Sequence, residues 1–125
     1  MFDKNQLYTR RQIHDILGEG GLDDYLPHKN KEIVCGCFRE DTNPEAPDII
    51  LVGNGRDIYR YACIFCKQKH FVPVFIKKAV NEWRYVGDYR VERWSESASD
   101  ISKQKRLSGR TEIRRVLFLE QEQNA

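Results

Sequence analysis

The sequence lacks any hydrophobic run that approaches the roughly 20 residues needed to cross a bilayer. Its N-terminus, MFDKNQLYTRR, also lacks the apolar segment of a secretory signal peptide. Internal repeats and low-complexity segments are absent as well. These absences predict a cytoplasmic (cytosolic) protein that has no membrane partner.

Catalytic patterns are equally scarce. The three histidines, His14, His28 and His70, are scattered and form no metal-binding cluster. The sequence shows no nucleophile beside a general base, and it shows no cluster of metal ligands that would leave a coordination position open. An enzyme is therefore the least favoured class, although a small nuclease that uses Lys, Tyr and Arg side chains stays open.

The composition is that of a globular protein. At 125 residues, with 40% hydrophobic and 32% charged residues, we expect residues 1–125 to form a single domain. The net charge of +2 conceals an asymmetry: the first 60 residues hold 8 Lys/Arg and 11 Asp/Glu, and the remainder hold 13 and 8. This asymmetry fits a basic face toward a polyanion, and an ordinary solvated surface explains it about as well.

The stretch from Phe71 to Trp94 has two β-patterned runs that meet at a turn. Apolar residues alternate from Val72 to Ile76, which is the period of a strand with two different faces. Pro73 cannot donate to a ladder, so this strand should begin at or near an edge. The Gly87-Asp88 pair marks a place where the chain reverses or bulges. We therefore expect a curved hairpin.

The segment RRQIHDILG predicts a helix that follows Tyr8 and Thr9 and ends at Gly18. The apolar residues spaced i, i+3 and i+4 on its face, and so expected to be buried, are Ile13, Ile16 and Leu17.

Further elements are expected along the rest of the chain. We expect strands at Glu32–Phe38, Ile49–Val52 and Val116–Glu120. We expect helices at Asp57–Lys67 and in the basic segment ISKQKRLSGR, which closes at Gly109. So many short strands would leave exposed edges in a flat sheet. The fold class is therefore α+β, a small, strongly curved or barrel-like mixed sheet flanked by two or three short helices.

Four cysteines form a CxC and a CxxC pair, Cys35, Cys37, Cys63 and Cys66. Two such pairs can supply a tetrahedral zinc site. The alternatives are buried free thiols, which a reducing compartment favours, a redox-active CxxC and a structural disulfide. We expect free thiols and no cofactor, with zinc as the open alternative.

The opening YTRRQIHDILG followed by a Gly-Gly pair, Tyr8 to Gly21, resembles the start of the SRA-like domains of McrA-type restriction enzymes. The resemblance implies a PUA-like barrel that reads modified double-stranded DNA, with a base turned out of the duplex into a pocket. It also implies restriction or phage defence as the context. The HNH nuclease module of those enzymes is not visible in this sequence, so a separate nuclease subunit is the implied partner.

The resemblance transfers no site residue, so candidates come from local chemistry. Aromatic rings stack on bases, carboxylates and amides pair with base edges, and guanidinium groups bind phosphates. The candidates are Trp83, Tyr85 and Tyr89 for stacking, Asn54 and Asp88 for the base edge, and Arg56, Arg90 and Arg93 for phosphates. Each also fits an ordinary role in the core, in a turn or on a solvated face. The alternative function is a small protein-interaction module, with or without zinc.

Overall fold

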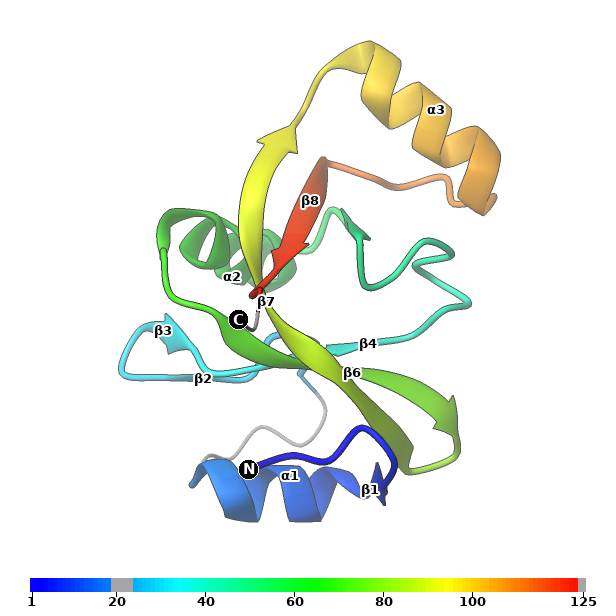
Figure 1. The fold of residues 1–125 in the computed structure, drawn as a ribbon. Helices are drawn as coiled ribbons and strands as arrows, with labels where there is room; N and C mark the ends of the chain where they lie inside the picture. Colours follow the sequence, from blue (N-terminus) through cyan, green and yellow to red (C-terminus); the bar gives the residue numbers. More distant parts are fainter. Residues whose placement is uncertain (19–23, 124–125) are drawn as a thin grey trace.

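The computed structural model describes residues 1–18 and 24–123. A mixed six-stranded sheet has the strand order β4-β6-β7-β8-β5, with β1 also paired to β7, and β2 and β3 form a separate pair. The expected α+β architecture is confirmed (Figure 1). The elements are β1 (Leu7–Tyr8), α1 (Arg10–Leu17), β2 (His28–Lys29), β3 (Glu32–Ile33), β4 (Gly36–Phe38), β5 (Ile49–Val52), α2 (Arg56–Lys67), β6 (Val72–Ala79), β7 (Glu82–Ser95), α3 (Ala98–Ser108) and β8 (Arg115–Gln121).

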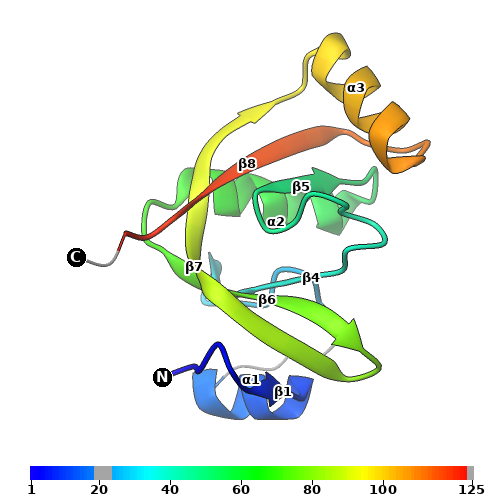
Figure 2. The same cartoon turned by 45° about the vertical axis from the view of Figure 1, so that its right-hand side comes forward.

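The long strand β7 is the spine of the sheet, because it pairs with β1, β6 and β8. It bends strongly as it runs from the α1 end of the molecule to the α3 end (Figures 1 and 2). The bend includes a bulge: Val74 pairs with Gly87 and Phe75 with Tyr85, which leaves Val86 between two ladder positions. Gly87 has φ of 134°, a conformation that side-chain-bearing residues rarely adopt. The chain therefore bulges at Gly87, and it reverses earlier, at Val80 and Asn81.

The alternation in β6 separates two cores, as the sequence predicts. Val72, Val74 and Ile76 pack with α2 on one face of the sheet. Phe75 points to the other face and packs with α1 and β1. Pro73 faces Asp88 of β7, and the pairing of β6 with β4 starts only at Val74, so the predicted edge position of Pro73 is also confirmed.

Helix α1 begins and ends where the sequence predicts, with a Thr9 capping box and a left-handed Gly18. The prediction that Ile16 is buried is wrong, since 43% of this residue is exposed. The face that packs against the sheet has the full i, i+3, i+4, i+7 spacing and includes two polar residues that an apolar pattern overlooks. Its members are Arg10, Ile13, His14 and Leu17.

Other expectations differ in detail. The single strand expected over Glu32–Phe38 is divided, because β3 pairs with β2 and β4 pairs in parallel with β6. Helices α2 and α3 are confirmed, and α3 starts at a Ser97 cap and closes at Gly109. Strand β8 lies between β7 and β5, so the expectation that it pairs inside the sheet is confirmed.

Candidate nucleic-acid interface

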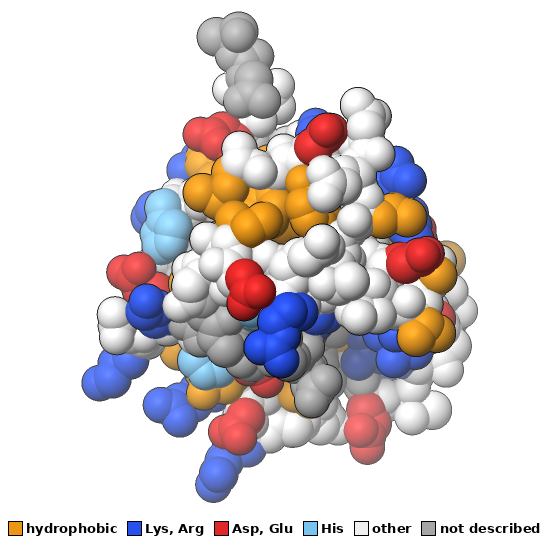
Figure 3. All heavy atoms as spheres, turned by 90° about the horizontal axis from the view of Figure 1, so that it is seen from below, with side chains coloured by type: hydrophobic (Ala, Val, Ile, Leu, Met, Phe, Trp, Pro, Cys, Tyr) orange, Lys and Arg blue, Asp and Glu red, His pale blue; other side chains and the backbone are white. Residues whose placement is uncertain are grey.

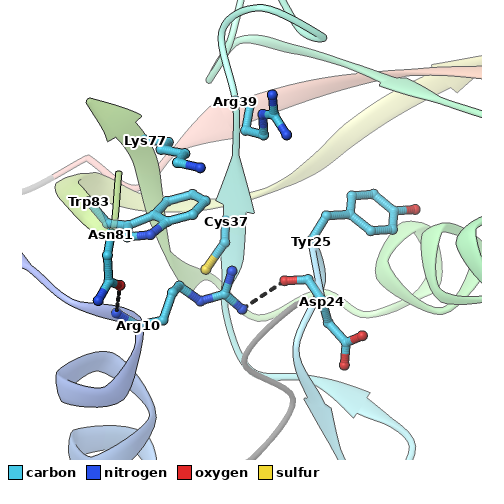
Figure 4. A pocket seen from close by; sticks show the side chains of 8 residues that line it. All are labelled: Arg10, Asp24, Tyr25, Cys37, Arg39, Lys77, Asn81 and Trp83. Atoms are coloured by element: carbon cyan, nitrogen blue, oxygen red, sulfur yellow. Dashed lines mark hydrogen bonds between the residues drawn. The ribbon is translucent and has the colours of Figure 1, made fainter. Parts of the chain in front are cut away.

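A cavity of about 330 Å³ lies beside the β6–β7 hairpin, where α1, β4 and the segment before β2 converge (Figure 4). It has the size of a small-molecule site. Figure 4 shows Trp83 and Tyr25 on either side of the Cys37 thiol. The residues that line it are Arg10, Asp24, Tyr25, Cys37, Arg39, Lys77, Asn81 and Trp83.

Backbone pairing at the free edge of β4 positions Tyr25. The Cys37 amide donates to the Tyr25 carbonyl at 2.9 Å, which draws the segment before β2 against β4. The Tyr25 hydroxyl donates to the Ile58 carbonyl of α2 at 2.5 Å. Burial raises the pKa of Tyr25, so the hydroxyl stays protonated and keeps this donor role. Both ends of the tyrosine are therefore anchored.

Arg10 ties the other side of the cavity together. Its guanidinium donates to His14 at 3.1 Å and to the Asp24 carbonyl at 2.8 Å, and it lies 5.1 Å from the centre of the Trp83 ring. The Arg10 amide donates to the Asn81 side-chain oxygen at 3.0 Å. One residue thus links α1, the hairpin turn and the segment before β2.

Two further cations line the cavity. The Lys77 ammonium lies 6.0 Å from the centre of the Trp83 ring. Arg39 binds both oxygens of Asp41, and this contact holds the pKa of that carboxyl below its usual value. The Arg39 side chain is nevertheless 55% exposed, so it can reach a ligand. With Arg10, three cationic residues and one acidic residue, Asp24, line the cavity.

Two neighbouring cavities extend this concave surface. One of about 350 Å³ shares Tyr25, Cys37 and Arg39 with the first and reaches Arg110. Another of about 300 Å³ shares Arg39 and Lys77. The Arg110 guanidinium donates to the Leu51 carbonyl at 3.0 Å on the free edge of β5. We refer to these three cavities together as the groove; cationic side chains line each of them.

The bulge of β7 separates Tyr89 from the other two aromatic candidates, because Trp83 and Tyr85 lie in the core on the α1 side. Trp83 lines the first cavity, although only 5% of it is exposed. Tyr85 packs against Phe2 and Phe75, and its hydroxyl donates to Asp88 at 2.8 Å. Tyr89 is buried in the core that faces α2. The structure therefore does not bring the three rings together. Asp88, a candidate for the base edge, is the hydrogen-bond partner of Tyr85.

The remaining candidates lie elsewhere. Arg90 forms an ion pair with Glu120 at 2.6 Å, and Arg93 stacks on Phe118 at 3.7 Å. The Arg56 side chain, at the start of α2, is 94% exposed. Asn54 lines a cavity of about 420 Å³ that adjoins the groove at Arg110.

Of the residues that line the first cavity, sequence reasoning predicted only Trp83 as a binding residue and missed, among others, Arg10, Tyr25, Arg39 and Lys77. A signal existed for Arg10, because it completes the i, i+3, i+4, i+7 face of α1. Lys77 and Arg39 follow the apolar residues of two strands that pair in parallel, which places both near the same sheet edge. No sequence pattern marks Tyr25, because its position depends on the pairing with Cys37.

The cysteine pairs lie in different cores. Cys35 and Cys37, with their sulfurs 4.0 Å apart, belong to the α1 side, and Cys66 packs on the α2 side. Burial raises the pKa of the Cys66 thiol. Within residues 1–18 and 24–123, no three His, Cys, Asp or Glu side chains gather as metal ligands. Free thiols stay the prediction, with zinc as the open alternative.

The surface on the α1 side, seen from below, carries a patch of apolar side chains with charges of both signs around it (Figure 3). The described residues on this face therefore form no continuous positive surface for a polyanion. Among the described residues, no helix is both long and apolar enough to span a bilayer.

Comparison with known proteins supports the fold. The SRA domain of SUVH5, solved in a complex with hemimethylated CG DNA, aligns with a TM-score of 0.62 and 13% sequence identity, covering 100% of this chain and 94% of that chain. At this identity the likeness shows a shared SRA-like fold. No curated protein matches the sequence. The family model described as a domain of unknown function (DUF6697) matches residues 7–123, and the chain belongs to that family.

Proposed function

We propose that the protein reads modified bases in double-stranded DNA by accepting one base, turned out of the duplex, into the cavity beside Trp83. The observation that carries the proposal is this cavity of about 330 Å³, walled by Trp83 and Tyr25, in a chain with an SRA-like fold. A base flipped from a duplex needs an enclosed site with aromatic or apolar walls. Both rings are held in place by contacts made without a ligand, so the site is preformed.

The groove beyond the cavity suits the DNA backbone. Arg39 and Lys77 line both the first cavity and the third, where strand phosphates next to a flipped base would lie. Arg110 extends the positive charge along the second cavity. Lys and Arg side chains that neutralise phosphates release counterions, which makes binding fall with salt.

We further propose a restriction or phage-defence context, a cytosolic location and a separate nuclease subunit. The support is the resemblance of Tyr8–Gly21 to SRA-like domains of McrA-type restriction enzymes. Co-purification of a nuclease that cleaves only modified DNA, and only together with this protein, is the expected result.

A binding panel tests the reading function. Duplexes that are unmodified, methylated, hydroxymethylated, glucosylated or phosphorothioated are titrated at two salt concentrations. Arg39→Gln and Lys77→Met should weaken all duplexes about equally, and each should reduce the slope of log K against log salt by about one phosphate contact. Lys103→Met, on the exposed side of α3, is the matched control, because Lys103 lines none of the three cavities. It should leave the slope unchanged.

The panel separates reading from charge attraction. A reader binds at least one modified duplex more tightly than the unmodified one, at both salt concentrations. Equal binding to all duplexes would contradict the proposal and favour the alternative, a protein-interaction module.

A further inference from the structure

We propose that the protein has a second nucleic-acid site, which binds a single strand through Trp94 and Arg114. Neither residue lines any of the three cavities of the groove. The site lies where β7 leads into α3, at the end of β7 opposite α1 (Figure 2). The proposal therefore does not rest on the reading function.

Four side chains at this end of the sheet alternate as cation and aromatic ring. The Arg114 guanidinium lies 3.5 Å from the centre of the Tyr59 ring. The Arg115 guanidinium lies 5.0 Å from the centre of the same ring and 3.6 Å from the centre of the Trp94 ring. We call this series, Arg114, Tyr59, Arg115 and Trp94, the ladder.

Trp94 ends the ladder with one face of its ring open. Arg115 covers one face, yet 47% of Trp94 is exposed, so the other face is in contact with solvent. An exposed aromatic face stacks on a nucleobase of any kind, because every base has a π-face.

The open ring is held in place from below. Arg115, with 9% of its side chain exposed, donates to Glu96 at 2.7 Å and to the Tyr59 hydroxyl at 3.0 Å. The Tyr59 hydroxyl in turn donates to Glu96 at 2.6 Å. A ring supported in this way loses little conformational entropy when a ligand binds.

The charge of the ladder favours an anionic ligand. Its two guanidinium groups outnumber the carboxylate of Glu96, which already accepts from Arg115 and Tyr59. Arg114 is exposed and forms no ion pair with another of the described residues. Its guanidinium is therefore available to a phosphate.

A single strand of nucleic acid uses both features. Its unpaired bases can stack on Trp94, and its phosphates can bind Arg114. The bases of an intact duplex are stacked on one another, so a duplex offers this surface only its backbone. An acidic peptide would use the charge and leave the open ring face without a stacking partner.

Fluorescence anisotropy with labelled oligonucleotides tests the proposal. Thymidine and uridine strands of about 10 nucleotides, a length within the usual site size, are compared with an unmodified duplex of the same length. At least one strand should bind more tightly than the duplex, and the tighter of the two identifies the strand as DNA or RNA. Equal or weaker binding of both strands would overturn the proposal.

Variants of the ladder locate the site. Trp94→Leu should weaken strand binding at least about fivefold, and Trp94→Phe, which keeps a ring, should weaken it less. Arg114→Gln should reduce the slope of log K against log salt by about 0.7, the value for one phosphate of a single strand. Arg11→Gln, at an exposed position of α1, is the matched control and should change neither quantity.

The outcomes also separate this site from the reading function. Arg39→Gln and Lys77→Met alter the groove and should leave strand binding within about twofold; loss of strand binding there would place the strand in the groove and overturn the proposal. Polyglutamate that competes as well as the strand would show a protein-docking surface instead. Should Trp94→Leu melt well below the parent protein, Arg114→Gln decides the result, because Arg114 is exposed.

Discussion

Replacement of Arg115 by methionine should destabilise the protein by about 2 kcal/mol, because this guanidinium is nearly buried and joins α2, β7 and β8. Only 9% of its side chain is exposed. It donates to Glu96 at 2.7 Å and to the Tyr59 hydroxyl at 3.0 Å, and it stacks at 3.6 Å on Trp94. Methionine keeps most of the apolar stem and removes the charge.

The magnitude follows from these contacts. Hydrogen bonds to charged groups contribute about 1.5–3 kcal/mol when both partners are desolvated, and Glu96 is 37% exposed, so the lower part of that range applies. The stack on Trp94 adds roughly 0.5 kcal/mol at a half-exposed site. For a domain of this size a loss of about 2 kcal/mol lowers the Tm by roughly 8 °C.

Thermal unfolding followed by circular dichroism measures this shift. Arg93→Met is the matched control: Arg93 also stacks on a ring, that of Phe118, but it is exposed, so we expect a change of less than about 2 °C. A Tm for Arg115→Met as close to the parent protein as that of the control would refute the reasoning.

The same variant has a defined pH dependence. The Tyr59 hydroxyl, and secondly the Arg115 guanidinium, hold the pKa of Glu96 below its usual value. A lowered folded-state pKa stabilises the protein above the unfolded-state pKa of about 4.3, and this contribution is lost as the pH falls through the folded-state pKa. The gap between parent and variant should therefore be full at neutral pH and narrow below about pH 4.

Three further predictions concern the fold. In urea unfolding, Ile13→Ala should lower the free energy of unfolding by about 2–5 kcal/mol and Ile16→Ala by less than about 1 kcal/mol, because only Ile13 is fully buried. Equal losses would show that the α1 face is misassigned. Gly87→Ala should destabilise the protein by about 1–3 kcal/mol, and by more than Gly109→Ala does. At Gly109 the φ of 74° is less strained for alanine, and among the described residues no atom beyond the two chain neighbours lies within 4 Å of the added Cβ. The reverse order would contradict the bulge. Metal analysis of protein purified without chelator should find no zinc and thiol titration after unfolding should find four thiols; about one equivalent of zinc would overturn the expectation of free thiols.

The sequence predicts the fold well where a short-range pattern decides the structure. Alternation from Val72 to Ile76 assigns the two faces of β6, and the Thr9 and Gly18 caps set the limits of α1. It fails where tertiary contacts decide. Ile16 has the right spacing, but an eight-residue helix packs only one narrow face, and Ile16 lies outside it.

The candidate site is predictable only in part, because it is assembled from distant segments. Trp83 stands out in the sequence as a large aromatic residue in a curved hairpin, and it does line the cavity. Tyr85 and Tyr89 follow it in the same strand, but neither lines the cavity: Tyr85 packs in the same core as Trp83, and the bulge turns Tyr89 to the core on the α2 side. Tyr25 and Arg39 reach the cavity through the pairing at the β4 edge, which no local pattern encodes.

Tryptophan fluorescence tests the central claim, that a base enters the cavity beside Trp83. The chain has two tryptophans, so Trp94→Phe leaves Trp83 as the only reporter, and Trp83→Phe leaves Trp94. On titration with a modified duplex that the protein binds, the Trp83 signal should change in parallel with binding, because the base contacts the indole, and the unmodified duplex should leave the signal nearly constant. A Trp83 signal that stays constant while the modified duplex binds, or that responds equally to the unmodified duplex, would contradict the account.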